Sequence, residues 1–185
     1  QVDDKENIKL IKDMTLNGLE YDFFGKESGR PTESISEKEF NINIDENGKK
    51  YAIRGFIDKL FLYKKKKLAI IRDFKSSKQV FKGKEITNNL QDLMYCLAVK
   101  HLYPEYLKRR SEFVFLKFDL SKDMFGKKGK GLLEMSPIEN EELEGFEYEL
   151  TEIQKYLDNF TIKNAKSDFA ADQDYPRDGT FGGPL

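Results

Sequence analysis

Apolar and polar residues alternate in the first half of the chain and predict a β-hairpin. Phe40, Ile42 and Ile44 are separated by polar residues, which is the two-residue period of a strand with one buried face. Residues 45–48 are Asp-Glu-Asn-Gly, and Asn-Gly favours the positive φ angles of a tight hairpin turn. A segment rich in Ile, Phe, Leu and Tyr follows at 51–63 and supplies the second strand.

A third strand is predicted directly after the hairpin. The lysines at 64–67 form a polar turn, and the apolar segment 68–74 follows them. A further strand is expected at 112–120, where large apolar residues occur on both faces, as in a sheet that is covered on both sides.

Apolar residues at helical spacing predict three helices around these strands. The first begins at Lys5 and ends near Asn17-Gly18, because glycine commonly follows the last helical residue. The second covers 88–103; Thr87 is its N-cap, and it stops before Pro104.

The third helix is long and acidic. Ser136-Pro137-Ile138-Glu139 is a capping box with proline at the first helical position. We expect one apolar row of this helix to face the interior: Ile138, Leu143, Phe146, Leu150, Ile153, Leu157 and Phe160. The order is therefore α-β-β-β-α-β-α, which predicts an α/β fold with a mixed central β-sheet flanked by helices. Residues 1–185 suffice for a single domain, in which 161–185 form an irregular tail.

Composition narrows the class of protein. Hydrophobic residues make up 38% of the chain and aromatic residues 13%, which is enough for a folded core. There is neither a run of about 18 apolar residues nor a signal peptide, so we expect an intracellular protein with no membrane association. Cys96 is the single cysteine, which excludes an internal disulfide and a four-cysteine iron–sulfur cluster. Because the chain begins at Gln1, we expect a domain excised from a longer protein.

Basic residues are concentrated around the predicted strands. Residues 49–84 include 13 Lys and Arg but only two acidic residues, Asp58 and Asp73. Residues 131–185 have the opposite bias, with 13 acidic and four basic residues. A basic segment of this size favours a nucleic-acid partner, because Lys and Arg neutralise phosphates. The lysines at 64–67 also have a simpler explanation, the protection of a sheet edge.

Asp58 and Asp73 each interrupt an apolar strand. A carboxylate in a buried strand destabilises the fold unless it is paired or binds a metal ion. Side chains alternate along a strand, so Asp73 and Lys75 face the same way. Two carboxylates on neighbouring strands beside an ammonium group predict a divalent-cation site for hydrolysis. The alternative is that the two aspartates form ordinary ion pairs with Lys59 or Arg72.

Three short motifs in this order resemble those of a known enzyme superfamily. They are Gly55-Phe56-Ile57-Asp58, Asp73-Phe74-Lys75 and Gln91-Asp92-Leu93-Met94-Tyr95. The pattern is similar to the Gly-x-Ile-Asp, Asp-x-Lys and Gln-x-x-x-Tyr motifs of the RecB-like nuclease domains, within the PD-(D/E)xK nuclease superfamily. The resemblance covers residues 35–103 and implies a restriction-endonuclease-like core of order α-β-β-β-α-β.

The resemblance implies a role for each motif residue. Asp58 and Asp73 would bind Mg²⁺ or Mn²⁺ together with the backbone carbonyl of Phe74. Lys75 would orient the attacking water or contact the phosphate. Two residues of the helix motif would line the active-site groove, Gln91 and Tyr95. For the tyrosine, simple packing in the core is the alternative.

A further acidic ligand is expected upstream of these motifs. Many RecB-like domains have a histidine on the preceding helix, whereas the single histidine of this chain is His101, to which we assign a structural role. Glu37 and Glu39 lie on the strand before the hairpin turn, and Glu20 on the preceding segment is the other candidate.

The resemblance implies a metal-dependent deoxyribonuclease, in particular an exonuclease that acts on single-stranded or frayed DNA ends in repair, recombination or replication. A helicase or recombination protein, on the same or another polypeptide, is the expected partner class. Two lysine-rich loops are expected to bind the DNA backbone: Lys78, Lys82 and Lys84, and Lys127, Lys128 and Lys130. The alternative is a nucleic-acid-binding module that has this fold but no turnover.

Overall fold

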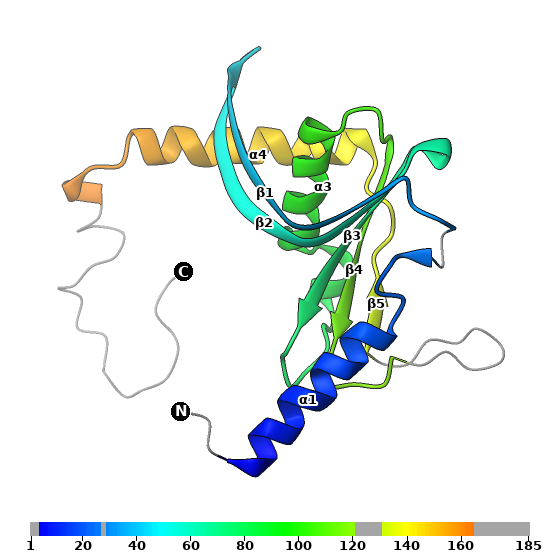
Figure 1. Ribbon diagram of the computed structural model, residues 1–185. Coiled ribbons are helices and arrows are strands. Elements are labelled where there is room, and N and C mark those ends of the chain that lie inside the picture. The colour runs from blue at the N-terminus through cyan, green and yellow to red at the C-terminus, as the bar shows by residue number, and fades with distance from the viewer. Residues whose placement is uncertain (1–3, 27–28, 121–130, 165–185) are drawn as a thin grey trace.

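The computed structural model describes residues 4–26, 29–120 and 131–164. Its centre is a five-stranded sheet with the strand order β1-β2-β3-β4-β5 (Figure 1). The strands are β1 (Glu33–Glu46), β2 (Lys49–Tyr63), β3 (Leu68–Lys75), β4 (Lys108–Phe115) and β5 (Leu132–Glu134). The helices are α1 (Lys5–Glu20), α2 (Lys84–Thr87), α3 (Leu90–Leu102), α4 (Asn140–Asp158) and the short 3₁₀ helix η2 (Lys64–Lys66).

The sheet is mixed, as predicted. β1, β2 and β3 are successive antiparallel neighbours, β4 lies parallel to β3, and β5 pairs antiparallel with β4. Because β3 and β4 are parallel, the chain must cross over between them, and it does so through α3. The largest core cluster joins one face of the sheet to α3 and α4, with Leu60, Leu97 and Leu143 fully buried in it. The α/β fold with flanking helices is therefore confirmed.

β1 and β2 form a long, curved hairpin (Figure 1). The predicted turn is confirmed, since Asn47 and Gly48 have φ angles of 51° and 77°. At the other end of β2, η2 leads into β3, and Lys67 in the left-handed conformation ends this turn.

One row of the β1–β2 ladder is interrupted. Glu37 and Asp58 face each other there and are left out of the pairing, and Glu37 has a φ angle of 50°, which is costly for a residue with a side chain. Along β2, the side chains that face the core are every second residue up to this row, and the pattern shifts by one residue after it. Ile57 and Leu60 both lie in the same core cluster, although they are three residues apart. Residues three apart in a regular strand would point to opposite faces. The irregularity gives Asp58 the same face as Leu60.

A buried carboxylate of α4 holds the outer end of the hairpin. Glu147, which is 3% exposed, accepts hydrogen bonds of 2.6 Å from both Lys49 Nζ and the Tyr51 hydroxyl. Lys100 and His101 of α3 lie 3.1 and 3.2 Å from the same carboxylate. Burial alone would raise the pKa of Glu147, but these hydrogen bonds outweigh it and lower the pKa to about 2. The cluster thus joins β2, α3 and α4.

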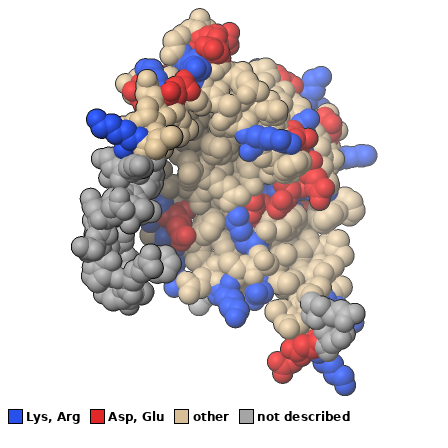
Figure 2. Space-filling view, turned by 90° about the vertical axis from the view of Figure 1, so that its left-hand side faces the viewer, with Lys and Arg blue, Asp and Glu red and all other residues tan. Residues whose placement is uncertain are grey.

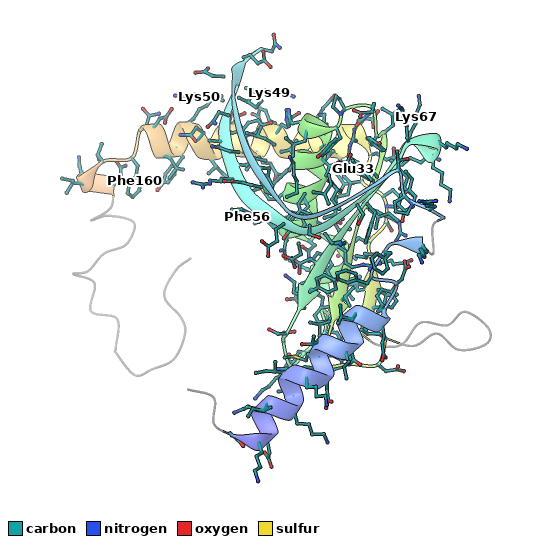
Figure 3. The ribbon with its side chains drawn as sticks, in the orientation of Figure 1. Glu33, Lys49, Lys50, Phe56, Lys67 and Phe160 are labelled. Carbon is teal, nitrogen blue, oxygen red and sulfur yellow. The ribbon has the colours of Figure 1, made fainter. Side chains whose placement is uncertain are left out.

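The charge segregation of the sequence is not retained in space. The acidic helix α4 lies along the basic hairpin, where Lys49 pairs with Glu147 and Lys50 with Asp158, each at 2.6 Å. Lys49 and Lys50 lie beside α4, at the opposite end of the hairpin from Lys67 (Figure 3). On the face in Figure 2, Lys and Arg form separate groups interspersed with Asp and Glu.

The predicted end of the first helix is wrong, because α1 continues past Asn17-Gly18 to Glu20. A Cβ at Gly18 would come within 3.1 Å of Leu116, and Asn17 Nδ2 donates a hydrogen bond of 2.9 Å to the Leu116 carbonyl. The glycine therefore permits close packing after β4 and does not end the helix.

The predicted capping box is also wrong, because α4 begins at Asn140. The residues before it are extended along β4: the N–H groups of Met135 and Ile138 donate to the carbonyls of Ser111 and Arg109. Tertiary pairing with β4 therefore overrides the local helix signal.

Only the first half of the expected apolar row of α4 faces the core. Leu143 and Phe146 are buried and Leu150 packs against the core cluster. Ile153 and Leu157 are 55% and 56% exposed, so their predicted inward orientation is wrong. The helix extends beyond the sheet at this end, which leaves these side chains uncovered (Figure 1).

Other boundaries differ by a few residues. The N-cap of α3 is Asn89, whose side chain accepts from the Asp92 N–H, whereas Thr87 ends α2. The strand expected at 112–120 is β4, which begins at Lys108 and ends at Phe115. Of the tail at 161–185, only 161–164 belong to the described residues, and 162–164 form a helical turn. None of the helices in the described part of the chain combines the length and apolar character that a membrane span requires.

Candidate functional site

Asp58 on β2 and Asp73 on β3 occupy adjoining positions in the sheet. Lys59 and Arg72 are paired in the antiparallel ladder, so the two aspartates come next in the same register. Asp58 Oδ2 accepts a hydrogen bond of 2.9 Å from the N–H of Phe74, which holds the side chain against β3. The structure therefore brings together the two carboxylates that the sequence predicts as metal ligands.

One oxygen of Asp73 is held by residues of α3. Asp73 is 4% exposed, and its Oδ1 accepts hydrogen bonds of 2.7 Å from Gln91 Nε2 and 2.8 Å from the Tyr95 hydroxyl. Gln91 and Tyr95 are one helical turn apart, and Gln91 Nε2 also donates to the Tyr95 oxygen at 2.7 Å. These three predicted site residues therefore form one network.

Lys75 belongs to the same network. Its Nζ lies 2.8 Å from Asp73 Oδ2 and donates a hydrogen bond of 2.7 Å to Gln91 Oε1. The rings of Phe113 and Phe81 flank the ammonium group, with centroids at 5.4 and 5.9 Å. Neither ring was identified from the sequence. Phe113 lies opposite Asp73 through the parallel pairing of β3 with β4, a register that the sequence does not display.

The second oxygen of Asp73 is incompletely satisfied. Although Lys75 is close, Asp73 Oδ2 is buried and accepts no hydrogen bond of normal geometry from the described residues. Burial also raises the pKa of Asp58, and the charges of Asp73 and Glu37 raise it further. The Phe74 N–H and the Lys75 ammonium act in the opposite direction. A cation bound beside the two carboxylates would offset the desolvation of Asp58 and give Asp73 Oδ2 a further partner.

These donors fit Mg²⁺ or Mn²⁺ better than a metal that needs a complete protein cage. Mg²⁺ keeps several waters and is commonly held by one or two carboxylates. Among the residues that the structure describes, no three Asp, Glu, His or Cys side chains gather closely enough to hold a metal. The available metal ligands are therefore Asp58, Asp73 and the backbone carbonyl of Phe74, and water would complete the coordination.

The three upstream acidic candidates differ in position. Glu37 faces Asp58 across the interrupted row, and its charge contributes to the raised pKa of Asp58. Glu39 pairs with Arg54 at 3.0 Å on an exposed surface. Glu20 is the last residue of α1, and it is exposed. Only Glu37 therefore has a position next to the two aspartates.

Arg72 and Lys59, the alternative ion-pair partners of the two aspartates, bind other residues. Arg72 bonds to Glu112 at 2.6 Å, and Lys59 Nζ donates to the Ser36 hydroxyl at 2.9 Å. Both side chains alternate with those of the aspartates along their strands, so they point to the opposite face. Neither Lys59 nor Arg72 therefore pairs with Asp58 or Asp73.

The loop at 76–83 continues from the site. Its Val80 and Phe81 pack against the cluster around Phe113 and Phe115, which fixes the loop beside Lys75. The first set of lysines expected to bind DNA is exposed in this loop and at the start of α2: Lys78, Lys82 and Lys84. The second set lies outside the described residues: Lys127, Lys128 and Lys130. Contact of either set with DNA stays a prediction.

Comparison with known proteins does not assign a family. No family model matches the chain, and no curated protein sequence matches it. Among solved structures, the crystal structure of SSO0001 is similar to 82% of this chain, with 19% identical residues and a TM-score of 0.37. The match spans 61% of the length of that protein, and at this level of similarity it carries no argument about function.

Proposed function

We propose that the chain is a Mg²⁺- or Mn²⁺-dependent nuclease domain of the RecB-like type, with a restriction-endonuclease-like core, that hydrolyses phosphodiester bonds of DNA. One observation carries the proposal: residues from three motifs far apart in the sequence meet in a single network. Asp73, Lys75, Gln91 and Tyr95 are joined by hydrogen bonds or an ion pair, and Asp58 adjoins them.

Asp58 and Asp73, with the Phe74 carbonyl, would hold the metal ion. Such an ion, when bound, lowers the pKa of a water molecule and neutralises charge on the attacked phosphate. Gln91 and Tyr95 engage Asp73 Oδ1 and so fix the carboxylate, with Oδ2 beside the Lys75 ammonium. Burial and the charge of Asp73 raise the pKa of Tyr95, so its hydroxyl stays protonated and keeps donating at neutral pH.

Lys75 would act on the phosphate or on the water. Its ammonium group lies between Asp73 Oδ2 and Gln91 Oε1, and its side chain is 23% exposed. A cation held by two acceptors at the border of the solvent suits the neutralisation of phosphate charge or the orientation of a water molecule.

Single-stranded or frayed DNA ends are the proposed substrate, on the strength of the motif resemblance. The exposed Lys78 and Lys82 of loop 76–83 would contact the phosphates of any DNA backbone that leaves the network on this side. The second candidate is a nucleic-acid-binding module without turnover. It is favoured by the observation that no third acidic side chain of the described residues closes the metal site.

The substitution Asp73→Asn tests the proposal, with Asp45→Asn at the exposed end of β1 as the matched control. Labelled single-stranded and duplex DNA are incubated with each protein in Mg²⁺, Mn²⁺ or EDTA. We expect the wild type and the control to cleave DNA with metal and to be inactive in EDTA. Asp73→Asn should be slower by about a thousandfold, because its amide cannot replace a carboxylate ligand.

Two results would contradict this assignment. Near-normal cleavage by Asp73→Asn would refute the site, provided that circular dichroism shows a folded protein. DNA binding without cleavage in either metal would favour the binding module. Calorimetry with Mn²⁺ gives an independent readout, because Asp73→Asn should lose affinity for the ion while Asp45→Asn keeps it.

A further inference from the structure

A pocket lies at the start of β1, on the face of the sheet that carries Arg72. It has a volume of about 660 Å³, which is within the usual range of ligand sites. Its lining combines an aromatic ring, two cations and small residues: Phe24, Lys26, Arg30, Pro31 and Ser34. Phe24 is 62% exposed, so its ring is accessible from this pocket.

Buried groups hold the loop on one side of this pocket. Arg72 Nη1 donates a hydrogen bond of 2.8 Å to the carbonyl of Asp22, and the Tyr63 hydroxyl donates to the carbonyl of Gly25. Gly25 has a φ angle of 68°, and a Cβ there would lie 2.6 Å from the Phe61 ring. Only glycine therefore fits this position, and the loop is preorganised against the sheet.

The other side of the pocket is fixed to the lysine turn. The Thr32 N–H donates to the Leu62 carbonyl at 2.7 Å, and the Lys64 N–H donates to the Thr32 hydroxyl at 3.1 Å. A second depression of about 360 Å³ shares Arg30 and Pro31 with the first. Its lining adds the lysines of the turn: Lys64, Lys65 and Lys66. The two depressions together make a continuous basic surface.

We infer that this lysine-turn surface, composed of Phe24, Lys26, Arg30 and Lys64–Lys66, binds a single-stranded segment of polynucleotide outside the catalytic network. Aromatic rings bind bases by stacking, and adjacent cations bind the phosphates. Lys26 Nζ lies over the Phe24 ring, 5.5 Å from its centre, so a cation is beside the ring on which a base would stack. The inference deepens the proposed nuclease function and rests on it.

The position and extent of this surface favour a polynucleotide strand over a free nucleotide as its ligand. The cations continue from the first depression into the second, and Arg30 and Pro31 line both. Asp58 on β2 and Lys64 at the start of η2 are six residues apart, which corresponds to about 20 Å of extended chain. A strand that occupies both regions must therefore span several nucleotides.

Edge protection does not account for the lysine turn. The turn joins β2 to β3, and neither strand is at the edge of the sheet. The inferred binding of a polynucleotide gives these exposed lysines a role instead, so their removal should weaken that binding.

Fluorescence anisotropy with a labelled oligothymidylate of about 16 nucleotides, the upper end of common site sizes, tests the inference in EDTA. The variants are Phe24→Ala and the triple change of Lys64, Lys65 and Lys66 to Ser. Three exposed lysines of α1 changed to Ser provide the matched control: Lys5, Lys9 and Lys12. We expect Phe24→Ala to weaken binding about tenfold, as the loss of one stacked base does. The triple variant should flatten the slope of log affinity against log salt by about 0.7 for each lost phosphate contact.

Wild-type affinity and salt slope in both variants would overturn the inference, and so would equal losses in the α1 control. Displacement of the oligonucleotide by an equal concentration of thymidine monophosphate would overturn the assignment to a strand. The substituted side chains are exposed, and thermal melting confirms that each variant is folded. Cleavage assays separate this inference from the proposed function. Weakened binding in a protein that never cleaves DNA refutes the nuclease alone, whereas cleavage with unchanged binding refutes the surface alone.

Discussion

Glu147→Gln should destabilise the protein at neutral pH and leave it nearly unaffected in strong acid. The carboxylate of Glu147 accepts hydrogen bonds from Lys49 and Tyr51 of the hairpin and from Lys100 of α3. The amide that replaces it keeps one acceptor oxygen and the shape of the side chain, but it loses the charge that attracts the two lysines. The substitution therefore isolates the electrostatic part of the contact between the hairpin and α4.

The size of the effect follows from the pKa of Glu147. A fall from the ordinary 4.5 to about 2 corresponds to roughly 3 kcal/mol at about 1.36 kcal/mol per unit. The side chain of Lys49 is 37% exposed, so solvent screens part of this interaction. We expect a loss of about 2 kcal/mol, or roughly 4–8 °C in melting temperature for a domain of this size.

The pH dependence has a definite sign. Because the pKa in the folded state is below that of the unfolded chain, the stabilisation is fully present above about pH 4.5. It is lost as the pH falls from there through about 2, where the folded carboxylate also becomes protonated. The difference between wild type and Glu147→Gln should therefore shrink over this interval.

Urea denaturation followed by circular dichroism at pH 7, 4 and 2.5 measures this difference. Glu144→Gln, on the exposed side of the same helix, is the matched control and should change little at any pH. A destabilisation by Glu147→Gln that stays constant from pH 7 to pH 2.5 would refute the electrostatic explanation. It would show instead that the side chain acts through packing.

The remaining predictions concern the candidate site. Lys75→Ala should lower the single-turnover cleavage rate at saturating DNA and change DNA affinity little, since the ammonium contacts Asp73; a collapse of affinity with a normal rate would show a phosphate clamp only. Glu37→Gln should weaken Mn²⁺ binding measured by calorimetry, because Glu37 faces Asp58, whereas Glu39→Gln should have no effect. Equal effects of the two changes would mean that Glu37 supplies only general negative charge.

The fold was predictable where local signals agree with each other. Alternation and the Asn47-Gly48 turn gave the hairpin, and Pro104 gave the end of the helix that carries Gln91 and Tyr95. Local sequence patterns gave wrong predictions where contacts with a distant segment determine the conformation. Gly18 lies within α1 because Leu116 packs against it, and residues 135–138 are extended because they pair with β4.

The composition of the site was predictable, but its geometry was not. Motif spacing identified Asp73, Lys75 and Gln91, whose side chains the structure brings into contact. The aromatic neighbours Phe81 and Phe113 depend on the register of a parallel strand pair and on loop packing, which no local pattern encodes. Charge counts along the chain do not show pairing between distant segments, such as that of Lys49 with Glu147.

The acidic helix α4 has a consequence for selectivity. Glu147 and Asp158 already lie beside Lys49 and Lys50, where phosphates of the proposed DNA substrate would otherwise bind. An approaching strand would have to displace these carboxylates and would gain little, since it exchanges one set of anions for another. In the proposed nuclease, this end of the hairpin would therefore make few non-specific contacts with DNA.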